Sequence, residues 1–409
     1  MTPNGEVIFC RKRRTTLCGP DGETSIRFTI LIHTIFHIQS MSHSETISED
    51  CDLTALNSSV QSNLHAEAPP KHPDSHFDGF DYLRFFFMIM VLFAHTDFFA
   101  YFGNQYEKNH ESGANIWDVL YLQIQSCAVP TFVLMSMVLF CVKKPTWSRA
   151  WNRIVKLAYL YGFWVGAWVV YSGLRPEPTF YGVFEFIIRG GGWVLYTFTV
   201  LMLMTPMCCV AERMAKINSW IGPLLAVLIV LGTFAYLIED LKWTRKMYYW
   251  VPTCFVMAPF FGIWLSPKIH ALRSSAKLRW KVAGVFLLLA FISAWFEWRY
   301  SAAEHLHLYW RSFLPKHARP SVHLTAVAVI VLSLAVQTKA PRWVLFFARN
   351  SLGVYCLHPF ILRGVAQPVI DFVNPFAPDF AILVAVLVLA VLCSLITEFL
   401  RKAFKERLI

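Results

Sequence analysis

The chain has few charged residues and lacks the usual nucleotide-phosphate and metal motifs. Charged side chains make up 15% of its 409 residues, whereas soluble domains carry about 25%. No P-loop of the GxxxxGKS or GxxxxGKT type occurs, which excludes that kind of nucleotide site. The ten cysteines show no spacing typical of a metal site or a disulfide framework. We therefore expect the cysteines to serve as small apolar residues, and we expect no metal cofactor.

Apolar and aromatic side chains are abundant instead. Hydrophobic residues make up 56% and aromatic residues 16% of the sequence, and the mean hydropathy is +0.46. The apolar residues fall in repeated stretches of about 20, which is the length that crosses a bilayer as a helix. This predicts an all-α polytopic membrane protein with the lipid bilayer as a partner. The net charge of +11 comes from basic residues that cluster in short loops, so it does not indicate a nucleic-acid partner.

Ten stretches from Phe80 onward are predicted to span the membrane. They cover about residues 80–100, 117–142, 154–173, 193–211, 220–238, 248–265, 282–298, 321–338, 351–370 and 380–400. Residues 1–75 are polar, which predicts a disordered N-terminal extension ahead of a transmembrane domain over residues 76–409. An even number of spans puts both termini on the same side of the membrane. The loops of that side carry almost twice as many Lys and Arg as the others, which predicts cytoplasmic termini.

The first span contains both an arginine and a histidine. Ionisable residues inside membrane helices are costly, so Arg84 and His95 are functional candidates. Their separation of eleven residues is about three helical turns, so both project from one face about 16 Å apart. If Arg84 lies at the cytoplasmic surface, His95 lies near the middle of a hydrocarbon layer about 30 Å thick. This suits anion binding at the surface and proton chemistry deeper down. Asp81 is placed to cap the helix or to pair with Arg84.

The most basic stretch of the membrane region runs from Cys141 to Lys156. Within it, Arg149 and Arg153 lie one helical turn apart on one face. Together with Arg84 they are expected to form a cytoplasmic pocket for a phosphorylated ligand, because guanidinium groups match phosphate oxygens. The alternative is that these arginines only set the topology and contact lipid head groups.

Four segments of the chain follow one another in an order that points to a family of membrane enzymes. They are Asp81, Leu83 and Arg84 followed by His95; Ser126 to Phe140; Arg149 to Tyr161; and Asn350 to Leu362. Over about residues 78–405 the chain resembles the acyltransferase-3 family of integral membrane O-acyltransferases. It departs from the family pattern at Met137, which replaces a common glycine, and at Gly192, where many relatives have histidine.

The resemblance implies transfer of an acyl group, most simply acetyl, from cytoplasmic acyl-CoA to a hydroxyl group. The acceptor would be a glycan such as a polysaccharide or another extracytoplasmic molecule, and the location a bacterial inner membrane. His95 would be the general base, since the pKa of histidine, about 6.5, lies near the operating pH. Arg84, Arg149 and Arg153 would bind the donor. The alternative for His95 is a hydrogen bond that only stabilises helix packing.

Two residues of the late segment are possible supporting residues. His358 precedes Pro359, and a proline inside a helix leaves a backbone carbonyl without its partner. We expect His358 to fill that gap rather than to take part in catalysis, and Tyr355, one turn earlier, to support either role.

A transporter is the alternative function. In that case Arg84 and His95 would bind a substrate or relay protons across the membrane. The sequence shows no inverted repeat and no paired spans broken by Gly or Pro at matching positions, which favours the enzyme.

Overall fold

The computed structural model describes residues 77–96, 123–173, 192–244, 252–303 and 317–404. Every regular element within these ranges is a helix, which confirms the all-α class. Residues 75–409 form one compact unit. The seven cysteines in the described ranges are buried and free, as expected of small apolar residues. The predicted N-terminal extension, residues 1–75, lies outside the described residues.

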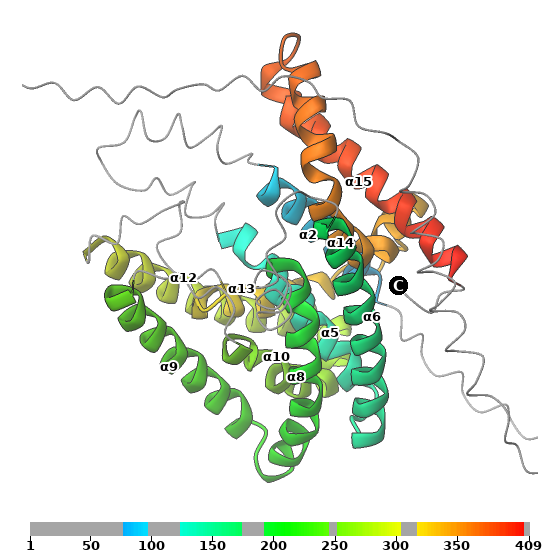
Figure 1. Ribbon diagram of the computed structural model, residues 1–409. Coiled ribbons are helices and arrows are strands. Elements are labelled where there is room, and N and C mark those ends of the chain that lie inside the picture. Colours follow the sequence, from blue (N-terminus) through cyan, green and yellow to red (C-terminus); the bar gives the residue numbers. More distant parts are fainter. Residues whose placement is uncertain (1–76, 97–122, 174–191, 245–251, 304–316, 405–409) are drawn as a thin grey trace, which may run out of the picture. The chain divides into compact units, whose positions relative to one another are not determined.

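Each of the ten predicted spans overlaps at least one described helix (Figure 1). In chain order these are α2 (Asp78–His95), α5 (Ala128–Val142), α6 (Trp147–Gly173), α8 (Gly192–Ile217), α9 (Ile221–Thr244), η2 (Pro252–Phe255), α10 (Met257–Leu265), η3 (Ser266–Lys268), α11 (Ile269–Ser274), α12 (Ala276–Ala303), α13 (Pro320–Ser333), α14 (Arg342–Val373) and α15 (Pro378–Ala403). In the described part of the chain, six helices are long and apolar enough to cross a membrane. The count of ten spans and the side of the termini stay predictions.

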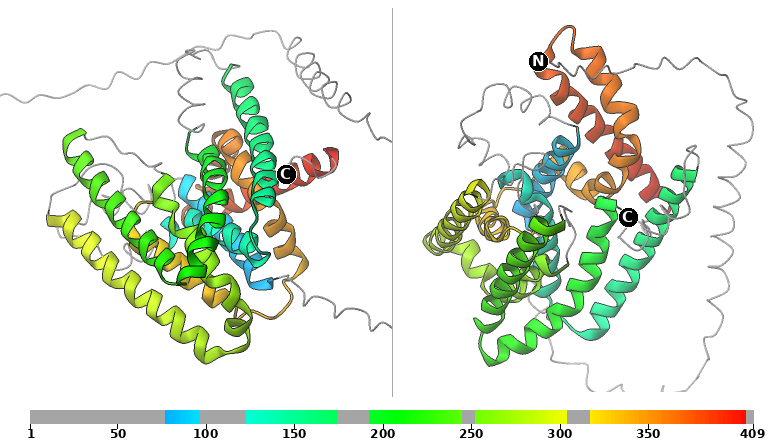
Figure 2. Two further views of the ribbon diagram at one scale, coloured as in Figure 1. Left: turned by 90° about the horizontal axis from the view of Figure 1, so that it is seen from below. Right: turned by 60° about the vertical axis from the view of Figure 1, so that its left-hand side comes forward.

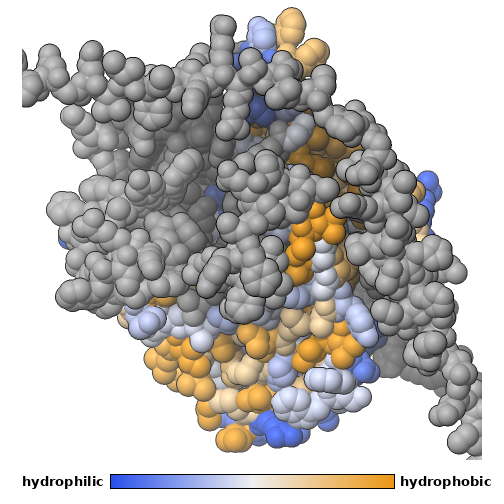
Figure 3. Space-filling view, in the orientation of Figure 1, coloured by the Kyte–Doolittle hydropathy of each residue, from blue (hydrophilic) through white to orange (hydrophobic). Residues whose placement is uncertain are grey.

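Three helices expose large apolar side chains along much of their length. They include Leu224, Leu228 and Leu231 on α9; Leu288, Phe291 and Trp295 on α12; and Leu387, Val391, Leu395 and Phe399 on α15. Figure 3 shows hydrophobic surface in the lower part of the view, where Figure 1 places α8 and α9. Continuous exposed apolar faces of this kind are costly in water. In a bilayer the same faces contact lipid chains, so the surface fits an integral membrane protein.

Helices α2 and α14 pack against each other and run in the same direction. Near the start of α2, the ring centroid of Phe85 lies 5.1 Å from Trp343 and 5.5 Å from Phe347. At the end of α2, the ring of His95 lies 4.9 Å from that of His358. Residue numbers therefore rise together along the two helices. Because of this parallel packing, residues of α2 and α14 that are far apart in sequence lie at the same height along the two helices.

Helix α15 packs along α14, and the two run side by side in the right-hand view of Figure 2. Met88, Leu389 and Cys393 belong to one buried apolar cluster shared by α2, α14 and α15. At Gly353 the backbone of α14 comes so close to Thr397 that an added Cβ atom would clash with that side chain. Glycine is thus required there by the close approach of α15.

Helix α14 begins well before its predicted span. The structure starts it at Arg342, whereas the apolar stretch suggested a start near residue 351. The first turns carry Arg342 and Arg349, whose charges lower the hydropathy of that segment. Arginines at the water-facing end of a membrane helix keep their head groups solvated, so charge there does not end the helix.

Candidate functional site

A pocket of about 610 Å³ lies between the first turns of α2 and α14. Its lining residues are Asp81, Arg84, Arg342, Leu345, Phe346 and Arg349. Three guanidinium groups and one carboxylate thus border one space. The excess of positive charge suits a ligand that carries several phosphate oxygens.

Two of these arginines are held by carboxylates of the protein. Arg84 Nη1 donates a hydrogen bond to Asp81 Oδ1 at 3.1 Å, so Asp81 makes the pairing contact that was one of its two expected roles. Arg349 Nη2 donates to Glu398 Oε2 on α15 at 3.0 Å. The other oxygen of Glu398 accepts a hydrogen bond from Arg401 at 2.8 Å. These contacts orient two of the three guanidinium groups of the pocket.

Arg342 differs from the other two arginines. It is the first residue of α14 and its side chain is exposed. Among the residues that the structure describes, no carboxylate forms an ion pair with it. Its charge is therefore the least compensated of the three.

The second part of the site is a pair of histidines at the far end of α2. His95 is the last residue of this helix, and its ring centroid lies 4.9 Å from that of His358 on α14. His358 is 1% exposed. The ring of Tyr355 lies 6.0 Å from His358, and the Tyr355 hydroxyl forms a 2.8 Å hydrogen bond with Thr197 on α8. The structure thus brings His95, His358 and Tyr355 together.

His358 also contacts the backbone of its own helix, as expected of a residue next to proline. Its Nδ1 lies 3.2 Å from the carbonyl oxygen of Val354. Pro359 frees the carbonyl of Tyr355, four residues before it, and the ring of His358 interacts with the backbone of Tyr355 as well as with that of Val354. A carbonyl only accepts hydrogen bonds, which assigns the proton of the neutral ring to Nδ1 and the lone pair to Nε2. His358 therefore has one nitrogen committed to α14 and one available as an acceptor.

The arginine pocket and the histidines lie along the same two helices. From Arg84 to His95 the rise along α2 is about 16 Å, and from Arg349 to His358 along α14 it is about 13.5 Å. Each helix thus carries an arginine toward its start and a histidine further along. Only Arg84 and His95 share a helix face, because the nine residues from Arg349 to His358 turn about half a circle more than two full turns.

Arg149 and Arg153 contact α5 rather than this pocket. Arg149 Nη1 donates to the carbonyls of Lys143 and Lys144, at 2.6 Å each, and Arg153 donates to the carbonyl and the hydroxyl of Ser136. Because the last carbonyls of a helix lack backbone partners, arginine donors stabilise that end. The structure does not bring these two arginines together with Arg84 in the pocket described above. Their binding of a donor stays a prediction.

Sequence reasoning missed Arg342 and Arg349 as members of the site. Both precede the predicted span 351–370, in a segment whose basic residues the sequence assigns to a loop. Arg349 precedes His358 by nine residues, which places the two on opposite faces of a straight helix, unlike Arg84 and His95, so the spacing gave no signal. What the sequence could not show is that the two helices lie parallel and in register.

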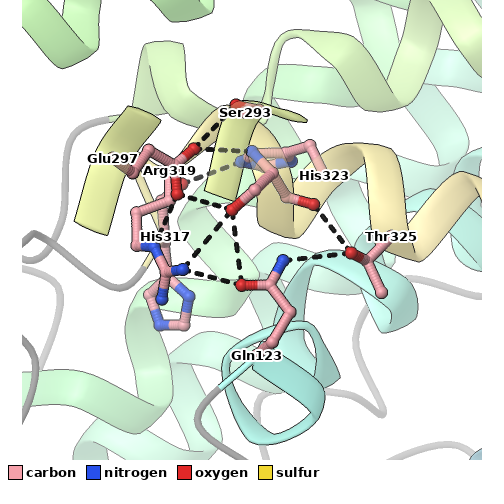
Figure 4. A network of polar contacts seen from close by, with 8 residues as sticks. Gln123, Ser293, Glu297, His317, Arg319, His323 and Thr325 are labelled. Carbon is pink, nitrogen blue, oxygen red and sulfur yellow. Dashed lines mark hydrogen bonds and ion pairs between the residues drawn. The ribbon is translucent and has the colours of Figure 1, made fainter. Parts of the chain in front are cut away.

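A buried polar network lies elsewhere in the molecule (Figure 4). Arg319 and Glu297, 1% and 3% exposed, form an ion pair with Nε and Oε2 2.9 Å apart. The other carboxylate oxygen of Glu297 accepts the backbone N–H of Ser321 at 2.8 Å. Gln123 accepts from Arg319 at 2.7 Å and donates to Thr325 at 3.0 Å. The network joins α12, α13 and the helical residues that precede α5, and its ion pair is buried among them, which indicates a structural role.

One family comparison matches most of the chain. A family model described as an acyltransferase domain matches residues 77–399. This range includes the arginine pocket, both histidines and Tyr355. No curated protein and no solved structure matches the chain.

Proposed function

The chain belongs to the acyltransferase-3 family and is a membrane acyltransferase, and from this premise we propose the reaction that its site supports. The protein transfers an acyl group, most simply acetyl, from acyl-CoA to a hydroxyl group of a glycan or a similar acceptor. The observation that carries this proposal is the parallel pair of helices α2 and α14. Together they hold an arginine pocket at one end and the contact of His95 with His358 further along.

The pocket supplies the donor site. Coenzyme A carries a diphosphate and a further phosphate on its nucleotide end, and the guanidinium groups of Arg84, Arg342 and Arg349 are suited to bind them. The flexible pantetheine arm then extends along α2 and α14. The rise of about 16 Å from Arg84 to His95 is within reach of such an arm.

His95 is the general base of the transfer. As the acceptor oxygen attacks the thioester carbonyl, His95 takes the hydroxyl proton, and the new C–O bond forms. The C–S bond then breaks, and the sulfur of coenzyme A leaves as a thiolate that takes up a proton. General-base catalysis of this kind contributes about 10²- to 10⁴-fold to a rate. His358, fixed to the Val354 carbonyl through Nδ1, acts as a positioning residue for the His95 ring.

The charge of the loops supports an orientation with the arginine pocket facing the cytoplasm, where acyl-CoA is made. Both termini then lie in the cytoplasm of a bacterial cell, and the chain resides in the inner membrane. The acceptor is reached from the other side, so the acyl group crosses part of the bilayer while bound to the protein.

Release of coenzyme A by the purified protein tests this function. With acetyl-CoA and solubilised envelope material as acceptor, the wild type is expected to release free thiol. Arg84→Gln is expected to raise the KM for the donor, and His95→Ala to lower kcat. His270→Ala removes an exposed histidine on α11 and serves as the matched control. Uptake of solute into proteoliposomes without thiol release would instead support a transporter.

A further inference from the structure

The order of side chains along α14 corresponds to the order of chemical groups along coenzyme A. Arg342 begins the helix, Arg349 follows two turns later, and His358 lies about 13.5 Å beyond Arg349. In an acyl-CoA the phosphate on the ribose is furthest from the thioester, the diphosphate comes next, and the pantetheine arm separates both from the reacting carbonyl. If His95 and His358 mark the position of the thioester, the helix start faces the nucleotide.

We propose that Arg342 determines the specificity of the donor site by binding the phosphomonoester on the ribose of coenzyme A. Arg84 and Arg349 bind the diphosphate. This inference rests on the proposed function, since it assigns parts of one donor to parts of one pocket. It adds a prediction that acyltransfer alone does not make, namely that the site distinguishes coenzyme A from its analogue without the ribose phosphate.

The distribution of negative charge in the pocket supports this division. Arg84 is paired with Asp81 and Arg349 with Glu398, so each of these guanidinium groups is already partly compensated. Arg342 has no such ion pair among the described residues. A phosphomonoester carries a charge of about −1.5 to −2 at pH 7, the most concentrated charge on the donor. The phosphomonoester is therefore best matched by Arg342, the guanidinium group that forms no ion pair with a described carboxylate.

The spacing of the arginines also fits a ligand with two separate phosphate groups. Arg342 and Arg349 are seven residues apart, so they share one face of α14 with a rise of about 10.5 Å between them. Arg84 lies between their levels, because its neighbour Phe85 contacts both Trp343 and Phe347. The three arginines are thus spaced along the pocket, which suits a ligand whose phosphate groups lie apart.

The N-terminus of α14 adds to the attraction at Arg342. The backbone N–H groups of the first helical turn have no partners within the helix, and the helix dipole is positive there. Leu345, in that turn, lines the pocket, and its own N–H donates to the carbonyl of Pro341 at 3.1 Å, so the N–H groups without helical partners are those of residues 342–344. The position of Arg342 at the helix start therefore places the uncompensated guanidinium where the backbone also favours an anion.

Equilibrium binding to the purified full-length protein tests the proposal without an acceptor. Coenzyme A and dephospho-coenzyme A are titrated into the wild type, Arg342→Gln, Arg84→Gln and Lys339→Gln. Lys339 is an exposed cation three residues before Arg342 and does not line the pocket, so its variant controls for general charge. The wild type is expected to bind coenzyme A about tenfold more tightly than the dephospho analogue, the ratio that corresponds to one such contact.

Arg342→Gln is expected to remove this difference. The substitution should weaken the binding of coenzyme A about tenfold and leave the affinity for dephospho-coenzyme A unchanged. Lys339→Gln should keep the wild-type ratio of the two affinities. If the wild type binds both ligands equally, or if Arg342→Gln weakens both to the same extent, the assignment of Arg342 is wrong although donor binding stands. If the wild type binds neither ligand, the proposed function itself fails. Because Arg342 is exposed, thermal unfolding of its variant should match the wild type.

Discussion

The imidazole rings of His95 and His358 lie 4.9 Å apart, on parallel helices that are joined by more than 240 residues of chain. His95 is the last residue of α2, and His358 lies in the interior of α14. The proposed base therefore does not depend on α2 alone. Its environment is set by a second helix whose own histidine is fixed to a backbone carbonyl.

His358→Ala tests this positioning role. The variant is expected to lower kcat by about tenfold, less than the full effect of about 10²- to 10⁴-fold expected for loss of the base. Because the neighbouring ring helps set the environment of His95, the pH profile of kcat should also shift. His358→Asn should restore part of the rate, since its amide can donate to the Val354 carbonyl. A normal pH profile with a normal rate in His358→Ala would exclude the role.

Glu398→Gln tests the carboxylate that holds Arg349. The neutral side chain orients the guanidinium less firmly, so the KM for acyl-CoA should rise about three- to tenfold, in keeping with the modest energies of partly exposed ion pairs. The value of kcat at saturating donor should stay close to wild type. Asp371→Asn removes an exposed carboxylate of α14 that contacts Gln367 and is the matched control. An equal rise in KM for both variants would point to a general charge effect.

Glu297→Gln tests the buried network. Removing one partner of a buried ion pair leaves the charge of Arg319 uncompensated and typically costs about 3–5 kcal/mol. Thermal unfolding in detergent should therefore shift to clearly lower temperature. The double variant Glu297→Gln with Arg319→Met should recover part of that loss, since no buried charge remains. Unchanged unfolding of the single variant would mean that the pair does not stabilise the fold.

Gly353→Ala tests the close packing of α14 against α15. The new Cβ atom meets the side chain of Thr397, so the two helices must separate. Glu398 follows Thr397 directly, and its contact with Arg349 should be disturbed as well. The expected result is lower stability together with a higher KM for the donor. Adding Thr397→Ala should relieve both effects in part, and Gly364→Ala, where an added Cβ meets no atom within 4 Å, should show neither.

Part of the site could be predicted from the sequence because it depends on one helix. The spacing of Arg84 and His95 determines that they share a face, and the i to i+3 relation of Asp81 and Arg84 allows their ion pair. The helices themselves follow from the apolar stretches. These features need only the geometry of a single helix.

The remaining features of the site depend on how the helices pack against one another, which a single-helix argument does not give. Nothing in the spacing of Arg342, Arg349 and His358 shows that α14 lies parallel to α2, and the charges of the first two residues shortened the predicted span. Arg149 and Arg153 had the residue type of a phosphate site, but in the fold their donors contact carbonyls of α5 and of the residues just after it. Glu297 lies within the predicted span 282–298 and Arg319 in the loop that follows it, and their pairing depends on how α12 packs against α13.

The most direct measurement compares the envelope glycans of cells that carry the wild-type gene with those of cells that carry the His95→Ala variant. With equal amounts of both proteins in the membrane, wild-type cells should contain glycans heavier by one acyl group, and the variant cells should lack that mass. If the cells with His95→Ala retain the same acylated glycans at the same level, His95 is not the base and the proposed mechanism is contradicted.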